Sequence, residues 1–111
     1  MAIHEDLAQG RWSSLSLADQ LGNVGSEVGR ALKRHREGRL ESFQSAFDRA
    51  LELLDLTSAD PRWRGTAKLR EILRSREVFC DYFFGGNQYG STPESLERYF
   101  FHFALAARLS L

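Results

Sequence analysis

The sequence predicts an all-α protein, an up-down-up-down antiparallel four-helix bundle that forms a single domain over residues 1–111. Apolar residues recur at helical spacing in four segments of similar length, and short connections join these segments. No segment alternates between apolar and polar residues over the length of a strand. A chain of 111 residues can bury one hydrophobic core but is too short for two domains.

The first two predicted helices span about residues 16–37 and 39–58. Ser16 followed by Asp19 is typical of a helix start, and Gly38 after a basic last turn is typical of a helix end. The apolar positions of the first helix follow a heptad pattern at Leu17, Leu21, Val24, Val28, Ala31 and His35. Because only one or two residues join the two segments, and Asp60-Pro61 ends the second, we expect an antiparallel helical hairpin.

The third and fourth predicted helices span about residues 66–84 and 93–109. The third has one broad apolar face and ends at Gly85-Gly86. The fourth begins after Ser91-Thr92-Pro93-Glu94, which combines candidate capping residues, proline in the first turn and an acid that suits the helix dipole. These signals place the start of the fourth helix more clearly than any other boundary.

Three glycines inside the first predicted helix lie along one edge, beside its heptad seam. Gly22, Gly25 and Gly29 each cost about 1 kcal/mol relative to alanine in a helix interior, and Ser26 extends the same small-residue surface. Such a surface allows another helix to approach closely. The sequence predicts helix packing or an interface at this edge, and it leaves open whether the approaching helix belongs to the same chain.

Basic residues are unevenly placed, although fifteen basic and fifteen acidic residues give a formal net charge of zero. Thirteen of the bases are arginine, which suits bidentate and interfacial contacts. The candidate nucleic-acid or partner-binding residues form two stretches: Arg30, Lys33, Arg34, Arg36 and Arg39, then Arg62, Arg64, Lys68, Arg70 and Arg74. These side chains either neutralise phosphates or form a solvated face paired with acids of the second helix. Trp63 either stacks on a base or closes the end of the bundle.

Aromatic residues gather in the second half of the chain, with nine of them between positions 79 and 103. A four-helix core cannot take all of them inward. Those off the central apolar seams are Tyr82, Phe84, Tyr99 and Phe101. Exposed aromatic residues in this number predict an interface and self-association.

Signals for catalysis or metal binding are weak. Arg30 and His35 have the Arg-x4-His spacing used by helical ribonucleases of the HEPN type, but a chain rich in arginine gives such a pair by chance. The Glu-x-x-His motif of carboxylate-bridged metal sites does not occur. Cys80 lies on an apolar helix face and reads as a small buried residue that has no cysteine to pair with. We therefore expect neither an enzyme nor a cofactor or metal site.

The segments SLADQLGNVGSEVGRALKRHREG and FQSAFDRALELLDLTSADPRW resemble the four-helix proteins of the ribosomal-RNA intervening-sequence group. Within that group the chain is most similar to the accessory variability determinant (Avd) proteins of diversity-generating retroelements, over residues 11–108. The resemblance implies a non-enzymatic ring-like homo-oligomer, often a pentamer, that associates with a reverse transcriptase and its template RNA. The retroelement proteins are typically strongly basic, whereas this chain is neutral.

The function expected from these observations is that of an oligomeric accessory protein that binds a reverse transcriptase, its RNA or both. The alternative is a structural or protein-interaction bundle with no nucleic-acid role, and an RNA-cleaving enzyme using Arg30 and His35 is a remote third reading. The first residues carry early acids and lack the apolar core of a signal peptide, and no run is apolar enough for a membrane span. A single cysteine suits a reducing compartment, so we expect a cytoplasmic protein.

Overall fold

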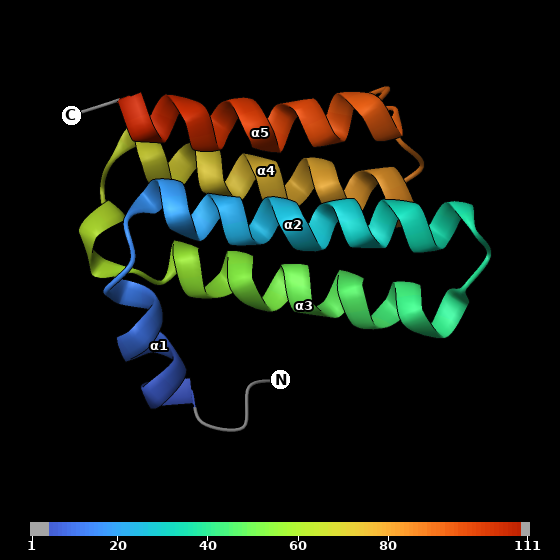
Figure 1. Ribbon diagram of the computed structural model, residues 1–111. Coiled ribbons are helices and arrows are strands. Elements are labelled where there is room, and N and C mark those ends of the chain that lie inside the picture. Colours follow the sequence, from blue (N-terminus) through green and yellow to red (C-terminus); the bar gives the residue numbers. More distant parts are fainter. Residues whose placement is uncertain (1–4, 110–111) are drawn as a thin grey trace.

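The structure is a computed structural model that describes residues 5–109. Over this range the chain is helical, without strands, as Figure 1 shows. Its elements are α1 (Glu5–Ser13), α2 (Leu17–Arg36), α3 (Leu40–Ser58), the 3-10 turn η1 (Pro61–Trp63), α4 (Ala67–Phe84) and α5 (Pro93–Leu109). The predicted all-α class is confirmed, and each of the four predicted helices agrees within one residue with α2, α3, α4 or α5.

Side chains cap the helices where the sequence places polar residues. The Ser16 hydroxyl accepts a hydrogen bond from the Asp19 amide at 3.1 Å, and the Thr92 hydroxyl accepts one from the Ser95 amide at 3.0 Å. These bonds satisfy amide groups that have no partner within the first turn of a helix. Between α2 and α3 the chain reverses at Gly38, whose φ of 72° is a left-handed conformation that glycine adopts without strain.

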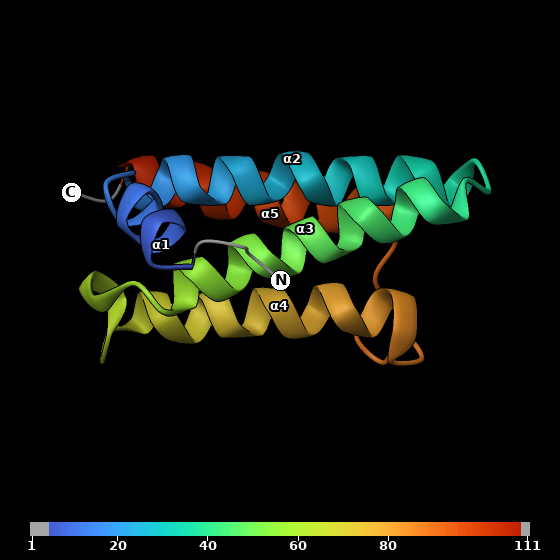
Figure 2. The same ribbon diagram turned by 90° about the horizontal axis from the view of Figure 1, so that it is seen from below.

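The four long helices run in alternating directions along the chain, as Figure 1 shows. Helix α2 packs against both α3 and α5, whereas α4 packs against α3. Figure 2 shows α2 and α5 on one side of the molecule and α4 on the other, with α3 crossing obliquely between them. The core lies where these helices meet, and its fully buried members include Leu21, Leu54 and Phe79.

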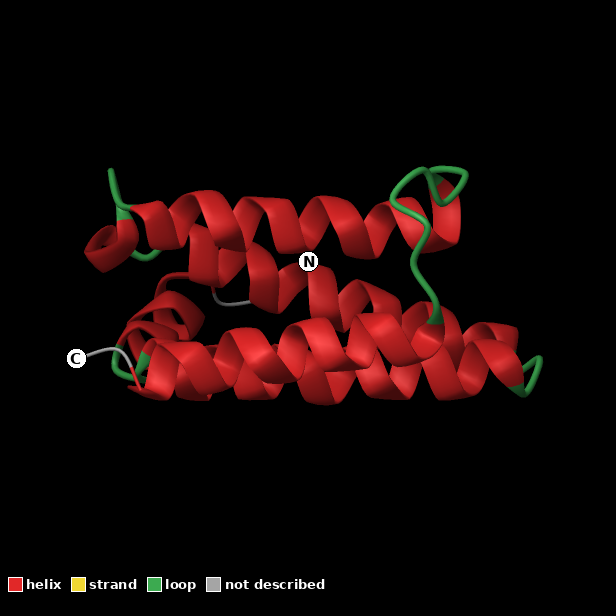
Figure 3. Cartoon of the chain, turned by 90° about the horizontal axis from the view of Figure 1, so that it is seen from above, coloured by secondary structure: helices red, strands yellow, loops and turns green. Residues whose placement is uncertain are grey.

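Helices α4 and α5 follow each other in the chain but lie on different sides of the molecule. The connecting loop crosses from one side to the other, which is clearest in Figure 3. Long side chains bring the two helices into contact: the rings of Phe79 and Phe100 have centroids 6.3 Å apart, and the Tyr99 hydroxyl donates to the Glu71 carboxylate at 3.0 Å. Together with α1, this division into two sides distinguishes the structure from four equivalent helices around one axis.

Helix α1 is a fifth helix that the sequence does not predict. Its nine residues have no apolar stripe and include Gly10, so periodicity gives no signal. Instead, Trp12 anchors it: this side chain is buried, and its indole N–H donates to the Thr57 hydroxyl of α3 at 2.8 Å. Helix α1 therefore forms part of the fold through one aromatic anchor.

Candidate functional site

Four of the predicted basic residues surround the turn between α2 and α3. We call Lys33, Arg34, Arg36 and Arg39 the basic end. Arg34 is half-buried and donates to the carbonyl of Ser42 at 3.4 Å, and Arg39 lies 3.6 Å from the Glu37 carboxylate. Within the described residues, Lys33 and Arg36 are exposed and make no ion pair. Arg30, one turn earlier, is bound to Glu27 at 2.8 Å.

The second basic stretch begins at the opposite end of the molecule. Figure 1 shows that α4 begins at the end where α2 also begins and where α5 ends. Arg64, Lys68, Arg70 and Arg74 are exposed. Arg62 differs, since its guanidinium is bound to Asp60. The ten predicted binding residues therefore form two separate groups and no single compact patch.

Trp63 closes the end of the molecule and is not available to stack on a base. Its side chain is 9 % exposed, and its indole N–H donates to the Gln20 side chain at 3.1 Å. Two cations cover the ring, with the Arg62 guanidinium carbon 4.6 Å and the Lys68 amine 5.3 Å from the ring centroid. Of the two readings of Trp63, the structure supports the lid.

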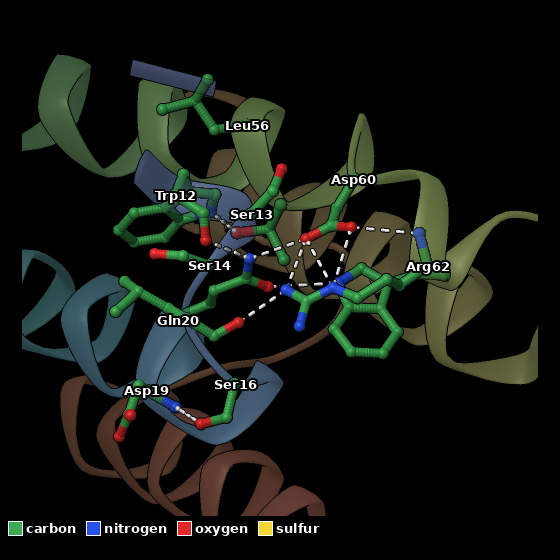
Figure 4. A network of polar contacts seen from close by, with 12 residues as sticks. Trp12, Ser13, Ser14, Ser16, Asp19, Gln20, Leu56, Asp60 and Arg62 are labelled. Atoms are coloured by element: carbon green, nitrogen blue, oxygen red, sulfur yellow. Dashed lines mark hydrogen bonds and ion pairs between the residues drawn. The ribbon is translucent and has the colours of Figure 1, made fainter. Parts of the chain in front are cut away.

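Trp63 belongs to a buried polar network that we call the Gln20 network, drawn in Figure 4. It comprises Trp12, Gln20, Thr57, Asp60, Arg62 and Trp63. The amide nitrogen of Gln20 donates to the Trp12 carbonyl and to the Asp60 carboxylate, both at 2.9 Å. Arg62 donates to Asp60 at 2.7 Å and also to the carbonyl of Leu15. The network joins α1, the start of α2, the end of α3 and η1.

Asp60 is the charged centre of the Gln20 network, and its side chain is fully buried. Burial by itself would raise the pKa of this carboxyl, but hydrogen bonds from Arg62 and Gln20 and the charge of Arg62 together lower the pKa below its usual range. The carboxylate thus stays ionised at neutral pH. No buried side-chain nitrogen or oxygen in the described part of the chain lacks a partner, so the network has no free group aimed at a ligand.

Sequence reasoning misses this network. Asp60-Pro61 reads as a helix stop, and Gln20 reads as one polar residue in an amphipathic helix. A local sequence feature that points to the network is the Asp-Pro-Arg segment, in which Asp60 caps η1 by accepting a hydrogen bond from the Arg62 amide at 3.0 Å. Nothing in the local sequence says that Gln20, forty residues away, supplies the other partner.

Arg30 and His35 contact different groups in this structure. Arg30 binds Glu27, and the His35 ring lies edge-on to Phe43 and Phe83, with centroids 5.0 and 5.1 Å away. His35 is a packing residue of the aromatic cluster between α2, α3 and α4.

The glycine edge of α2 is partly covered by α5. A Cβ at Gly25 would lie 3.7 Å from the Cβ of Phe100, so this glycine allows close packing within the chain. At Gly22 and Gly29 a Cβ would meet no atom within 4 Å, and Ser26 is exposed. Gly25 therefore packs within the chain, whereas the surface over Gly22 and Gly29 is open, so the edge allows contact both within the chain and with another chain.

The four predicted interface aromatics fall into two pairs. Phe84 and Phe101 are 65 % and 64 % exposed, whereas Tyr82 and Tyr99 are half-buried against the core. Burial, followed by the hydrogen bond to Glu71, raises the pKa of Tyr99, which keeps its hydroxyl protonated as a donor. Tyr82 packs against Phe83 with ring centroids 4.9 Å apart, and Tyr99 of α5 donates to Glu71 of α4, so both tyrosines are less exposed than Phe84 and Phe101.

An open groove of about 600 Å³ lies along α4 and the loop that follows it. Leu73, Cys80 and Phe84 provide apolar lining, and Glu77 and Tyr89 provide polar lining. Burial raises the pKa of the Cys80 thiol, so the thiolate needed for nucleophilic attack is disfavoured. The groove offers contact surface and no evident reactive group.

The described residues hold no cluster of three or more histidine, cysteine or acidic side chains suited to a metal ion. None of the described helices combines the length and apolar character needed to cross a bilayer. Comparison with known proteins found no matching family model, no similar curated protein and no similar solved structure. The resemblance to the Avd proteins therefore stays a hypothesis based on sequence pattern.

Proposed function

We propose that this chain is a non-enzymatic, oligomeric four-helix-bundle accessory protein that binds RNA, or a reverse transcriptase that carries RNA, through its basic end. The observation that carries the proposal is the group of four basic side chains at the α2–α3 turn. Two of them, Lys33 and Arg36, are exposed and without an ion pair among the described residues. Side chains of this kind can exchange water for phosphate at little cost.

The neutral net charge limits this binding to a local surface. With few phosphates neutralised, the affinity should be modest and should fall steeply with salt. Ribonuclease activity is not part of the proposal, because Arg30 and His35 are separately engaged. The partner class, a reverse transcriptase with its template RNA, comes from the resemblance.

Titration of a labelled single-stranded RNA at two salt concentrations tests the proposal. We expect binding at low salt that the charge reversals Lys33→Glu and Arg36→Glu abolish. The matched control reverses Arg64 and Arg70 at the other end, where both side chains are also exposed. Absence of binding at low salt, or equal loss in both double variants, would remove the RNA role.

A second candidate function, a protein-interaction bundle with no nucleic-acid role, is favoured by the groove along α4. Leu73 and Phe84 expose apolar surface beside it, with 49 % and 65 % of each residue accessible. Exposed apolar groups next to a concave surface are typical of protein contacts. Under this alternative, Phe84→Glu abolishes binding to a protein partner recovered with the wild type, and the charge reversals at the basic end leave it unchanged.

A further inference from the structure

The outer side of α5 carries an exposed apolar stripe. Phe101, Leu105 and Leu109, spaced four residues apart, are 64 %, 42 % and 72 % exposed. Figure 2 shows that α1, α3 and α4 all lie on one side of the α2–α5 pair. The exposed fractions of the three side chains show that the described part of the chain leaves the stripe largely uncovered. Exposed apolar side chains that lie next to one another in this way are typical of surfaces that contact another protein.

The register between α2 and α5 fixes which residues lie beside this stripe. Asp19 is bound to Arg108 at 3.3 Å, and Gly25 lies against Phe100. The helices are antiparallel, so Phe101 lies level with Gly25 and Ser26, and Leu105 lies level with Gly22. Around the axis of α5, Phe101 lies about 100° and Leu105 about 140° from Phe100, so both side chains point farther away from the core than Phe100 does.

Beside the stripe, α2 presents a hole lined only by small residues. Gly22, Gly25, Ser26 and Gly29 occupy positions i, i+3, i+4 and i+7, the four positions that form a hole for one side chain of a facing helix. Open space lies over Gly22 and Gly29. One face of the protein thus combines an exposed aromatic knob with a hole at the same level that is open over Gly22 and Gly29 and bordered at Gly25 by Phe100.

We propose that this face binds a second copy of the chain about a two-fold axis parallel to α2 and α5. Such an axis keeps every residue at its own level and places α5 of each copy over α2 of the other. Phe101 then enters the hole of the partner subunit, and Leu105 covers its Gly22. The match is reciprocal, as a two-fold interface requires.

The charges at the margins of this face agree with that arrangement. By the same register, the exposed Lys33 near the end of α2 lies level with the exposed Glu94 in the first turn of α5. At the other margin, Asp19 lies level with Arg108. In the dimer, Lys33 of one copy faces Glu94 of the partner, and Asp19 faces the partner's Arg108. Unlike charges therefore meet at both margins, which favours this register.

Self-association through this face needs no RNA, but it engages Lys33, so RNA binding by the dimer would depend on Arg36. The single variant Arg36→Glu separates the two proposals, because it should weaken RNA binding and leave the dimer intact. The two-fold arrangement specifies one contact of the oligomer and predicts a two-chain particle, whereas the resemblance implies a ring of five. Helix-to-helix contact through small residues also explains why α2 tolerates open glycines that weaken it as an isolated helix.

Light scattering coupled to size-exclusion chromatography measures the mass in solution. We expect the wild type to have the mass of two chains at about 100 µM and Phe101→Glu to weaken the dimer by at least about tenfold, because it buries a charge in the hole. Phe101 is exposed in the monomer, so the helical circular dichroism and melting transition should persist. The matched control, Phe84→Glu, changes an equally exposed phenylalanine on α4 and should leave the dimer intact.

Mixing two charge variants tests the pairing between chains. Lys33→Glu and Glu94→Lys should each weaken self-association, because each homodimer then faces like charges at two places. An equimolar mixture should restore association, since the heterodimer has unlike charges at both. A monomeric wild type, a five-chain particle unaffected by Phe101→Glu, or a mixture no stronger than the single variants would each overturn the proposal. A dimer that fails to bind RNA would remove only the proposed function.

Discussion

Different interactions stabilise the two ends of the molecule, a buried polar network at one and a cluster of aromatic rings at the other. At one end, the Gln20 network joins α1, α2, α3 and η1 through directional hydrogen bonds around the buried Asp60 carboxylate. At the other, Phe43, Phe83 and His35 pack as rings with centroids 4.9 to 5.1 Å apart. A buried polar group needs every partner in place, whereas an apolar cluster adjusts when one member shrinks. The polar end should therefore be more sensitive to single substitutions.

The largest effect is expected for Asp60→Ala. This change removes the acceptor of Gln20 and Arg62 and leaves their donors unsatisfied, so we expect a loss of about 3 kcal/mol in the free energy of unfolding. Urea denaturation followed by circular dichroism measures it. Ser58→Ala serves as the comparison: Ser58 also lies near the end of α3, but its hydroxyl donates only to carbonyls of its own helix, so its loss should be small. A loss for Asp60→Ala no larger than that for Ser58→Ala would show that the carboxylate is not the centre of this end.

At the aromatic end, Phe83→Ala should cost about 2 kcal/mol, less than for a fully buried phenylalanine because the ring is only half-buried. The ring contacts Phe43, Phe47 and Phe79, which can move toward the space it leaves. Phe84→Ala, at 65 % exposure, is the control and should cost less than half as much. A loss at Phe83 larger than that of Asp60→Ala would reverse the ranking of the two ends.

Acid should weaken the polar end selectively. The folded-state pKa of Asp60 lies below its value in the unfolded chain, so its contribution to stability is complete above the unfolded pKa, near 4, and falls as the pH drops through the folded pKa. The wild type should therefore lose more stability between pH 6 and pH 3 than Asp60→Asn, which cannot titrate. Thermal melts of both proteins across this range measure the difference. Parallel pH profiles would contradict the lowered pKa.

The contrast between the ends also explains what sequence reasoning could predict. The aromatic end follows from periodicity, because Phe43, Phe47 and Phe83 occupy apolar positions whose burial does not depend on one specific partner. The Gln20 network depends on contacts between residues forty positions apart, which no local pattern encodes. Helix α1 could not be predicted for the same reason, because Trp12 is positioned by a hydrogen bond to Thr57, which is distant in the sequence.

The candidate surfaces divide in a similar way. Helical spacing correctly places Gly22, Gly25 and Ser26 on one edge of α2. Which of the glycines packs within the chain depends on the register with α5, and spacing alone does not contain that register. Tyr82 and Tyr99 are half-buried, although helical spacing places them off the central apolar seams. Tyr99 of α5 is held by its hydrogen bond to Glu71 of α4, a contact between helices that the spacing within one helix does not contain.

The smallest effect is expected for His35→Ala, about 0.5 kcal/mol. The His35 ring is exposed, and it contributes two edge-on contacts, to Phe43 and Phe83, at the margin of the aromatic end. Alanine favours the helix, which offsets part of the loss. Urea denaturation measures the change, and the double variant with Phe83→Ala tests its origin. If His35 acts through the Phe83 ring, the loss of stability in the double variant should be smaller than the sum of the two single losses. Strict additivity would place the contribution of His35 elsewhere and leave Phe83 as an independent member of the aromatic end.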